Sequence, residues 1–151
     1  MRAATAAYVA GLLDGDGAIQ AKQIMRRRRA YWCISVNISS CIPRYLRDLR
    51  REVVLGKLTA WQPKDGRRIA ARWSFHGDHA LRLLKALLPH LRLKKRQAAA
   101  AIRFLTASKK RKTRTMSTPL IKARANAVAC IIRGNDKTRK QARPTKKRGI
   151  R

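Results

Sequence analysis

Apolar residues recur at two different intervals along this chain, and the interval distinguishes strands from helices. Between Tyr31 and Ile38 every second residue is a large apolar one, which predicts a strand with one buried face. The stretch Ala18–Met25 precedes it as another predicted strand, and the arginine run Arg26–Arg29 is expected to form the turn between them. The two strands therefore predict a hairpin.

A second hairpin is predicted further along the chain. Its strands are Leu58–Trp61 and Ile69–Phe75, and they flank the turn sequence PKDG at residues 63–66. In the later strand, Trp73 and Phe75 fall on the apolar face and Arg72 falls on the other. Strand parity also places Trp32 and Trp73 in the core rather than on the surface.

Helical spacing of apolar residues or helix-favouring composition marks the segments between and after the hairpins. The first helix ends at a pair of glycines, Gly15 and Gly17. The predicted helices are Thr5–Asp14, a segment from Pro43 to near Gly56, Leu81–Leu88, Leu93–Leu105, and one that opens at Thr118 and Pro119 and runs to about Ile131.

The element order is αββαββα followed by further helices, which predicts an α+β fold with a four-stranded, mostly antiparallel sheet. We expect helices on one face of that sheet, which leaves the other face for a ligand. Its polar residues are of kinds that hydrogen-bond to base edges. These candidates are Gln20, Lys22, Ser35, Asn37, Lys57, Thr59, Arg72 and Ser74, and we add Trp61 from the same face and Arg26, Arg28 and Arg67 from the turns. Arginines of the Arg26–Arg29 run are expected to contact phosphates or solvent rather than bases.

The net charge of the chain indicates which class of molecule it binds. The 151 residues include 38 Lys and Arg but only seven Asp and Glu, a net charge of +31 that favours a nucleic acid. The length and the 45% hydrophobic content predict one domain, residues 1–132, followed by a basic tail, residues 133–151, that is disordered without an anion. No apolar run suits a membrane span, so we expect a soluble, intracellular protein.

The three cysteines, Cys33, Cys41 and Cys130, have neither a zinc-site spacing nor a histidine pair nearby. They are expected to be small buried residues.

Two longer segments carry a family resemblance. The sequence VAGLLDGDG at residues 9–17 resembles the signature of the LAGLIDADG homing endonucleases, and LPHLRLKKRQA at residues 88–98 resembles that family's segment with an active-site lysine. The predicted element order matches that family as well. The resemblance implies an intron-encoded, Mg²⁺-dependent enzyme, with Mn²⁺ able to substitute, that cuts both strands of a long pseudo-palindromic DNA site.

By the same resemblance, Lys94 matches the active-site lysine and Arg44 a basic residue near the scissile phosphate. Only Ser39 or Ser40 stands where related single-motif enzymes carry a water-ordering glutamine. The family pairs its chains through the motif helix. The resemblance therefore assigns the dimer interface to the small residues Ala7, Gly11 and Gly15, four apart on one face, and to Asp14.

The acid pair Asp14 and Asp16 is unexpected in so basic a chain. Asp16 follows the end of a helix, where unpaired carbonyls and the negative end of the dipole favour a cation. Its carboxylate and the Gly15 carbonyl are hard oxygen ligands suited to Mg²⁺. We therefore predict that Asp16 and Gly15 bind metal, while Asp14 either packs or hydrogen-bonds at the dimer helix or binds metal too.

Two other functions fit parts of the sequence. The same fold could serve as an intron RNA maturase or as a DNA-binding protein without nuclease activity. A ribosomal-type RNA-binding protein would explain the charge but not the acid pair.

Overall fold

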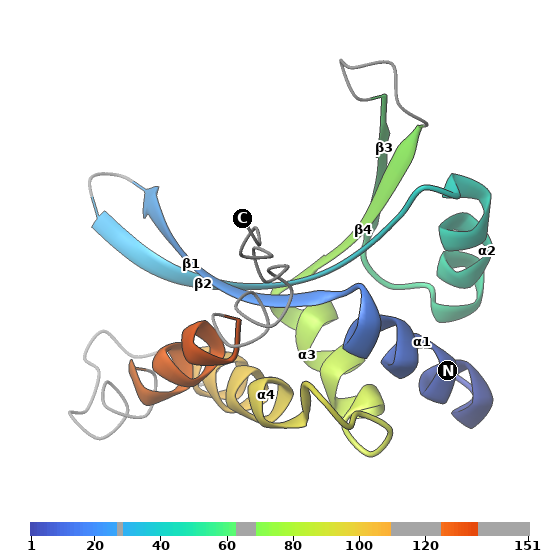
Figure 1. Cartoon of the computed structure of the whole chain (residues 1–151). Coiled ribbons are helices and arrows are strands. Elements are labelled where there is room, and N and C mark those ends of the chain that lie inside the picture. The colour runs from blue at the N-terminus through green and yellow to red at the C-terminus, as the bar shows by residue number, and fades with distance from the viewer. Residues whose placement is uncertain (27–28, 63–68, 110–124, 136–151) are drawn as a thin grey trace, which may run out of the picture.

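The computed structural model describes residues 1–26, 29–62, 69–109 and 125–135. Its elements follow the predicted order αββαββα, with more helix after it (Figure 1). They are α1 (Ala3–Gly15), β1 (Ala18–Arg26), β2 (Arg29–Ser40), α2 (Pro43–Val53), β3 (Lys57–Trp61), β4 (Ala70–His76), α3 (Gly77–Leu87), α4 (Lys95–Lys109) and a last helix over residues 125–135.

The four strands form one sheet in the order β1-β2-β4-β3, and every neighbouring pair is antiparallel. The predicted hairpins β1–β2 and β3–β4 are therefore confirmed, and the pairing of β2 with β4 joins them. The register aligns the predicted polar rows, because Asn37 lies opposite Ser74 and Ser74 lies opposite Lys57.

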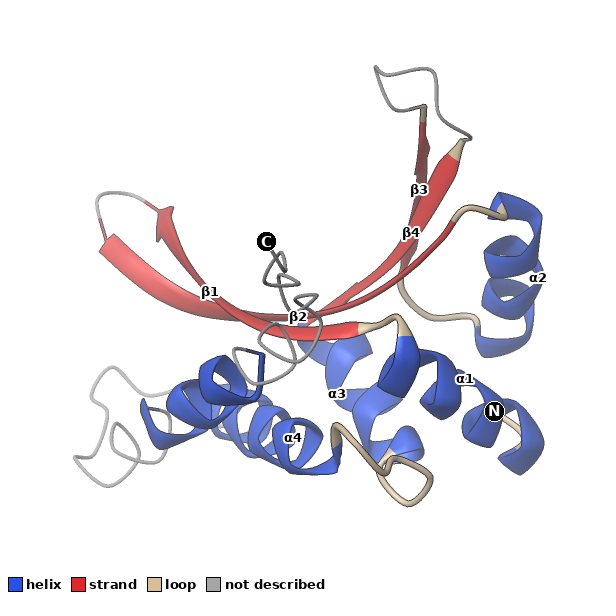
Figure 2. Ribbon diagram, viewed as in Figure 1, coloured by secondary structure: helices blue, strands red, loops and turns tan. Residues whose placement is uncertain are grey.

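Helices α1, α3 and α4 cover one face of the sheet, and α2 lies beside the β3–β4 end (Figure 2). The strands curve so that the other face, which no described helix covers, is concave, and we call it the open face. The covered face supplies fully buried side chains such as Ile19, Val36, Trp73 and Phe75. Leu83 of α3 and Leu13 of α1 pack into the same core. Burying one such side chain contributes about 1.5–3 kcal/mol, so this face holds the helices in place.

The strands of the first hairpin are longer than predicted. Arg26 and Arg29, expected in the turn, pair with each other as the last residues of β1 and the first of β2. Toward this end of the hairpin Trp32 is 40% exposed, so its prediction as a core residue was wrong. The strand places it on the helix-covered side, but the hairpin extends past the packed core, and Met25 on the same side is exposed too. Trp73 is buried as predicted, and its indole N–H donates to the Leu55 carbonyl at 2.8 Å.

Helix α3 starts at Gly77, four residues before the predicted start. The prediction missed its first turn because polar Asp78 and His79 interrupt the apolar periodicity there. Cys41 is exposed, contrary to the prediction for the cysteines, while Cys33 and Cys130 are partly buried.

The last helix is described over residues 125–135, and Ile131 is buried; the predicted helix start at Thr118 lies outside the described residues. Asn135 at the helix end donates from Nδ2 to the Ile19 carbonyl of β1 at 2.9 Å. Most of the predicted tail, residues 136–151, lies outside the described part of the chain. Within that part, the helices are too short or too polar to cross a bilayer.

Candidate functional site

The site begins where α1 ends. The amides of Asp16 and Gly17 both donate to the Leu12 carbonyl, each at 3.0 Å, and so close the helix. Gly17 packs against this turn so tightly that an added Cβ would lie 2.7 Å from the Leu13 Cα. The sharp exit leaves Asp16 exposed at the junction of α1 and β1.

Asp14, two residues before Asp16, is used inside the molecule. Its Oδ2 accepts the amides of Arg92 and Leu93 at 2.7 and 3.1 Å, and its Oδ1 accepts the amide of Lys94 at 2.9 Å. Because α4 starts at Lys95, the Asp14 carboxylate caps the beginning of that helix from a distant part of the chain. Partial burial raises the pKa of Asp14, but these three amide bonds outweigh it and hold the pKa below its ordinary value.

Lys94 adds a further contact between the end of α1 and the segment just before α4. Its side chain is 6% exposed, and its Nζ donates to the main-chain oxygen of Asp14. Burial lowers the pKa of Lys94, while the negative charges of Asp14 and Asp16 act against that shift. The structure therefore brings the motif acids and the predicted lysine together, although they are about 80 residues apart.

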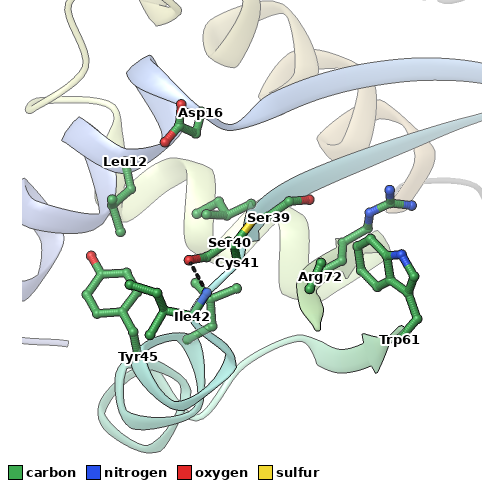
Figure 3. A pocket seen from close by; sticks show the side chains of 12 residues that line it. Leu12, Asp16, Ser39, Ser40, Cys41, Ile42, Tyr45, Trp61 and Arg72 are labelled. Carbon is green, nitrogen blue, oxygen red and sulfur yellow. Dashed lines mark hydrogen bonds between the residues drawn. The ribbon is translucent and has the colours of Figure 1, made fainter. Parts of the chain in front are cut away.

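A hollow of about 620 Å³ opens beside Asp16. Asp16 and Leu12 lie at one side of it, Trp61 and Arg72 lie at the other, and Ser39 and Ser40 lie between them (Figure 3). The hollow itself was not predicted from the sequence. Part of its apolar lining comes from Ile42, just before α2, and Tyr45, in α2, which are far in sequence from Asp16 and Arg72. Tyr45 also donates a hydrogen bond to the Tyr8 hydroxyl, which ties α2 to α1.

The predicted ligand-facing residues lie together on the open face of the sheet. Cross-strand neighbours share a face, and the pairs Gln20–Ser35, Asn37–Ser74 and Thr59–Arg72 follow one another across it. Lys22, Lys57, Thr59, Trp61 and Arg72 are exposed, Gln20, Asn37 and Ser74 are partly buried, and Ser35 is buried. Asn37 Nδ2 donates to Ser35 Oγ at 3.3 Å. His76, which lies opposite Ser35, is a further open-face residue that strand parity could have added to the prediction.

The structure describes the other predicted basic contacts only in part. Arg28 and Arg67 lie outside the described residues, and of Arg26 only the backbone, at the end of β1, is described. Arg44 is exposed in the first turn of α2, next to the hollow-lining Tyr45.

The predicted small-residue face of α1 is exposed. Ala7, Gly11 and Gly15 all lie at the surface, and a Cβ added at Gly11 or Gly15 would meet nothing within 4 Å. Tyr8, also on α1, is 52% exposed. The helix thus has room for close approach by another surface.

Ligands for a metal are sparse in a single chain. Within the described residues no three His, Cys, Asp or Glu side chains are grouped to hold an ion. The Asp16 carboxylate has no hydrogen bond or salt bridge to a described residue. Mg²⁺ commonly binds through one or two carboxylates, waters and substrate phosphates, so one exposed acid at a helix end fits that mode of binding.

Comparisons with known proteins give a consistent picture. No family model matches the chain, and a search of curated proteins found no match. Among solved structures, the homing endonuclease I-CvuI in complex with its target matches with a TM-score of 0.70 and 20% identity, over 98% of this chain and 87% of that one. The archaeal intron-encoded homing endonuclease I-Vdi141I complexed with DNA matches with a TM-score of 0.61 and 9% identity, over 96% and 88%.

A longer protein matches as well. The I-SmaMI LAGLIDADG homing endonuclease bound to cleaved DNA has a TM-score of 0.67 and 13% identity, over 97% of this chain but 51% of its own. With the αββαββα order, the antiparallel sheet and the helices on one face, these matches show that the chain has the LAGLIDADG homing endonuclease fold.

Proposed function

We propose that this protein is a homodimeric, metal-dependent, site-specific DNA endonuclease of the homing type. The observation that carries the proposal is the position of Asp16. It is an exposed acid at the end of the motif helix, and it lines a hollow that extends to Arg72 and Trp61 on the open face of the sheet. The fold it belongs to matches endonucleases solved with DNA.

The open face supports double-stranded DNA as the substrate. A concave sheet with polar side chains across its width can enter the major groove, where each base pair presents a distinct set of donors and acceptors. The net charge of +31 adds attraction to phosphates, which is independent of sequence. We assign phosphate contacts to Arg26, Arg28 and Arg67 and to Lys57 on the edge strand β3, and base contacts to the other open-face residues.

Asp16 and the carbonyl of Gly15 are the groups we propose for Mg²⁺, with Mn²⁺ as a substitute. The ion would supply Lewis-acid activation of the scissile phosphate. Lys94 contributes positive charge beside Asp16, and Arg44 stands next to the hollow, where it can contact a phosphate. In this assignment, Asp14 holds the segment that carries Lys94.

One acid serves one strand, so cutting a duplex requires two chains. The exposed face with Ala7, Gly11 and Gly15 is the surface we propose for the two-fold contact, with Asp14 at its end. The coverage of I-SmaMI agrees with this, because one copy of this chain corresponds to about half of that protein. A symmetric dimer would bring both Asp16 side chains to opposite strands of a pseudo-palindromic site. We also propose that the gene lies within an intron, as that of I-Vdi141I does.

One observation favours a second candidate, a DNA-binding protein or intron RNA maturase of the same fold without nuclease activity. Ser39 and Ser40 line the hollow between Asp16 and Arg72, in the place where the family resemblance expects a glutamine that orders water. The Ser40 Oγ accepts the amide of Ile42 at 3.0 Å, which uses one of its two acceptor positions, and a hydroxyl has one donor where a glutamine amide has two.

Asp16→Asn separates these candidates. The wild type should cleave sites selected from a randomised DNA library when Mg²⁺ is present, and the variant should bind the same sites with cleavage reduced by more than about 10²-fold. Asp48→Asn is the matched control, because Asp48 is an exposed acid on α2 whose only described ion pair is with Arg51.

Cleavage by Asp16→Asn at the wild-type rate would remove Asp16 from the mechanism. A wild type that binds its selected sites without cutting them, and that promotes intron splicing, would favour the maturase. Tighter binding to duplex RNA than to a matched DNA duplex, with no selected DNA site, would favour the ribosomal-type RNA-binding protein.

A further inference from the structure

Two exposed side chains on the open face contact each other. The Arg72 guanidinium carbon lies 5.2 Å from the ring centroid of Trp61, within the range of a cation–π interaction. Arg72 belongs to β4 and Trp61 to β3, and both line the hollow that contains Asp16 (Figure 3). Trp61 remains 39% exposed. The ring is therefore not needed to fill the core, and one contact that the structure describes for it is with Arg72.

The strand register explains how the contact forms. Trp61 lies directly opposite Ala70, and Arg72 lies opposite Thr59, so the tryptophan and the arginine are diagonal neighbours on one face. Because Ala70 has a short side chain, the indole can lie across it and reach the arginine. On its other side Arg72 lies opposite Ser39 of β2, whose side chain is also short.

The charge of Arg72 is not neutralised by any described residue. Among the residues the structure describes, the one salt bridge joins Arg51 and Asp48 on α2. The Trp61 ring therefore orients the guanidinium while leaving its five N–H donors available. An arginine held in place before binding loses less conformational freedom when it makes its hydrogen bonds.

We infer that Trp61 positions Arg72 to recognise a guanine in the major groove, at one symmetric pair of base pairs near the cleavage position. Arg72 lies on β4, which has strands on both sides, and in a sheet inserted into the groove a central strand faces base edges rather than phosphates. Guanine is the base that offers two acceptors, O6 and N7, to a side chain with donors only. The shared hollow with Asp16 places this contact toward the scissile phosphates. The inference rests on the proposed function and adds the identity of one base.

The test measures base preference without cleavage. Full-length wild type, Arg72→Ala, Arg72→Lys, Trp61→Ala and Trp61→Phe are each used to select bound duplexes from a randomised library, with Ca²⁺ in place of Mg²⁺. The wild type should enrich guanine at one symmetric pair of positions. Arg72→Ala should lose that preference by between about 5-fold and 100-fold and leave other positions unchanged.

Trp61 acts through Arg72, so its variants should change the same position and no other. Trp61→Ala should reduce the guanine preference about 2-fold to 5-fold, and Trp61→Phe, which keeps an aromatic face, should retain most of it. Thermal melting of each variant separates this effect from misfolding, because a purely structural tryptophan would lower Tm and weaken binding to all sequences alike.

Two outcomes would overturn the inference in distinguishable ways. If the wild type enriches a site but Arg72→Ala weakens binding evenly at all positions, Arg72 contacts a phosphate and the inference alone fails. If the wild type enriches no sequence at all, site-specific DNA binding fails, and the proposed function fails with it.

Discussion

The end of α1 and the open face of the sheet are both polar, but they use their polar groups in opposite ways. At the end of α1, the Asp14 carboxylate accepts three backbone amides and the Lys94 amine donates to the Asp14 carbonyl. On the open face, the described side-chain contacts are few: Asn37 with Ser35, and Arg72 with Trp61.

The polar groups at the end of α1 therefore hold parts of the chain in position, whereas those on the open face remain available to a ligand. Hydrogen bonds to a charged group contribute about 1.5–3 kcal/mol each, so the bonds of Asp14 fix the segment of Lys94 against the motif helix. Side chains with few internal partners add little to stability, but their donors and acceptors remain available to a ligand. Asp16 lies where these two regions meet, because it belongs to the hydrogen-bonded end of α1 and lines the hollow that reaches the open face.

The largest effect on stability is expected from Asp14→Asn. The amide group of asparagine would turn an N–H₂ toward backbone N–H donors, so at least one hydrogen bond is broken and the unfolding free energy falls by about 1.5–3 kcal/mol. Urea denaturation at neutral pH measures this. Ser74→Ala on the open face is the control, with an expected change within about 0.5 kcal/mol. Equal midpoints for Asp14→Asn and wild type would mean that the cap contributes nothing.

The pH dependence tests the same bonds by another route. The pKa of Asp14 is lower in the folded chain than its ordinary value of 3.8, so its contribution is present above that pH and is lost as the pH falls through the lower, folded-state pKa. The difference in stability between wild type and Asp14→Asn should therefore shrink as the pH falls below 3.8. A difference that stayed constant to lower pH would contradict the charged cap.

Gly17→Ala should destabilise by about 1–3 kcal/mol, because the new Cβ would lie 2.7 Å from the Leu13 Cα and the end of α1 would have to shift. Gly11→Ala is its matched control on the same element. A Cβ at Gly11 meets nothing within 4 Å, and alanine favours the helix by about 0.5–1 kcal/mol. Thermal melts at concentrations that keep the chain monomeric compare the two, and a decrease in stability for Gly11→Ala as large as that for Gly17→Ala would refute this account of the turn.

The smallest effect is expected on the open face, with Lys57→Gln. Stability should barely change, but the slope of log K against log salt should become shallower by about 0.9 for each phosphate that the side chain no longer neutralises. Binding to the selected duplex between about 50 and 200 mM salt measures the slope. Lys85→Gln on α3, on the covered side of the sheet, should leave the slope unchanged. Equal slopes for both variants would place Lys57 away from phosphates.

Much of this organisation could be predicted from the sequence because it depends on local periodicity. Alternation in β2 identified the buried row that contains Ile34 and Val36. The same kind of alternation in β4 placed Arg72 and Ser74 on the open face. The motif around Asp16 predicted both the helix end and the fold, and the solved structures agree with that fold.

Other features depend on interactions between distant segments and left no local signal. Trp32 has the parity of a core residue, but the hairpin extends beyond the core that would cover it. The sequence marked Asp14 as unusual without identifying its partners, because the 92–94 segment meets α1 only in the folded chain, where α3 packs against both α1 and α4.

By itself, the sequence determined which faces are apolar, where the chain turns and how strongly the molecule attracts a polyanion. Side-chain period and charge are properties of neighbouring residues, and they survive without a folded structure. Only the tertiary structure decided that Asp14 is engaged while Asp16 is exposed, and that Trp61 lies against Arg72. Those outcomes depend on strand register and helix packing, which join residues that the chain itself keeps apart.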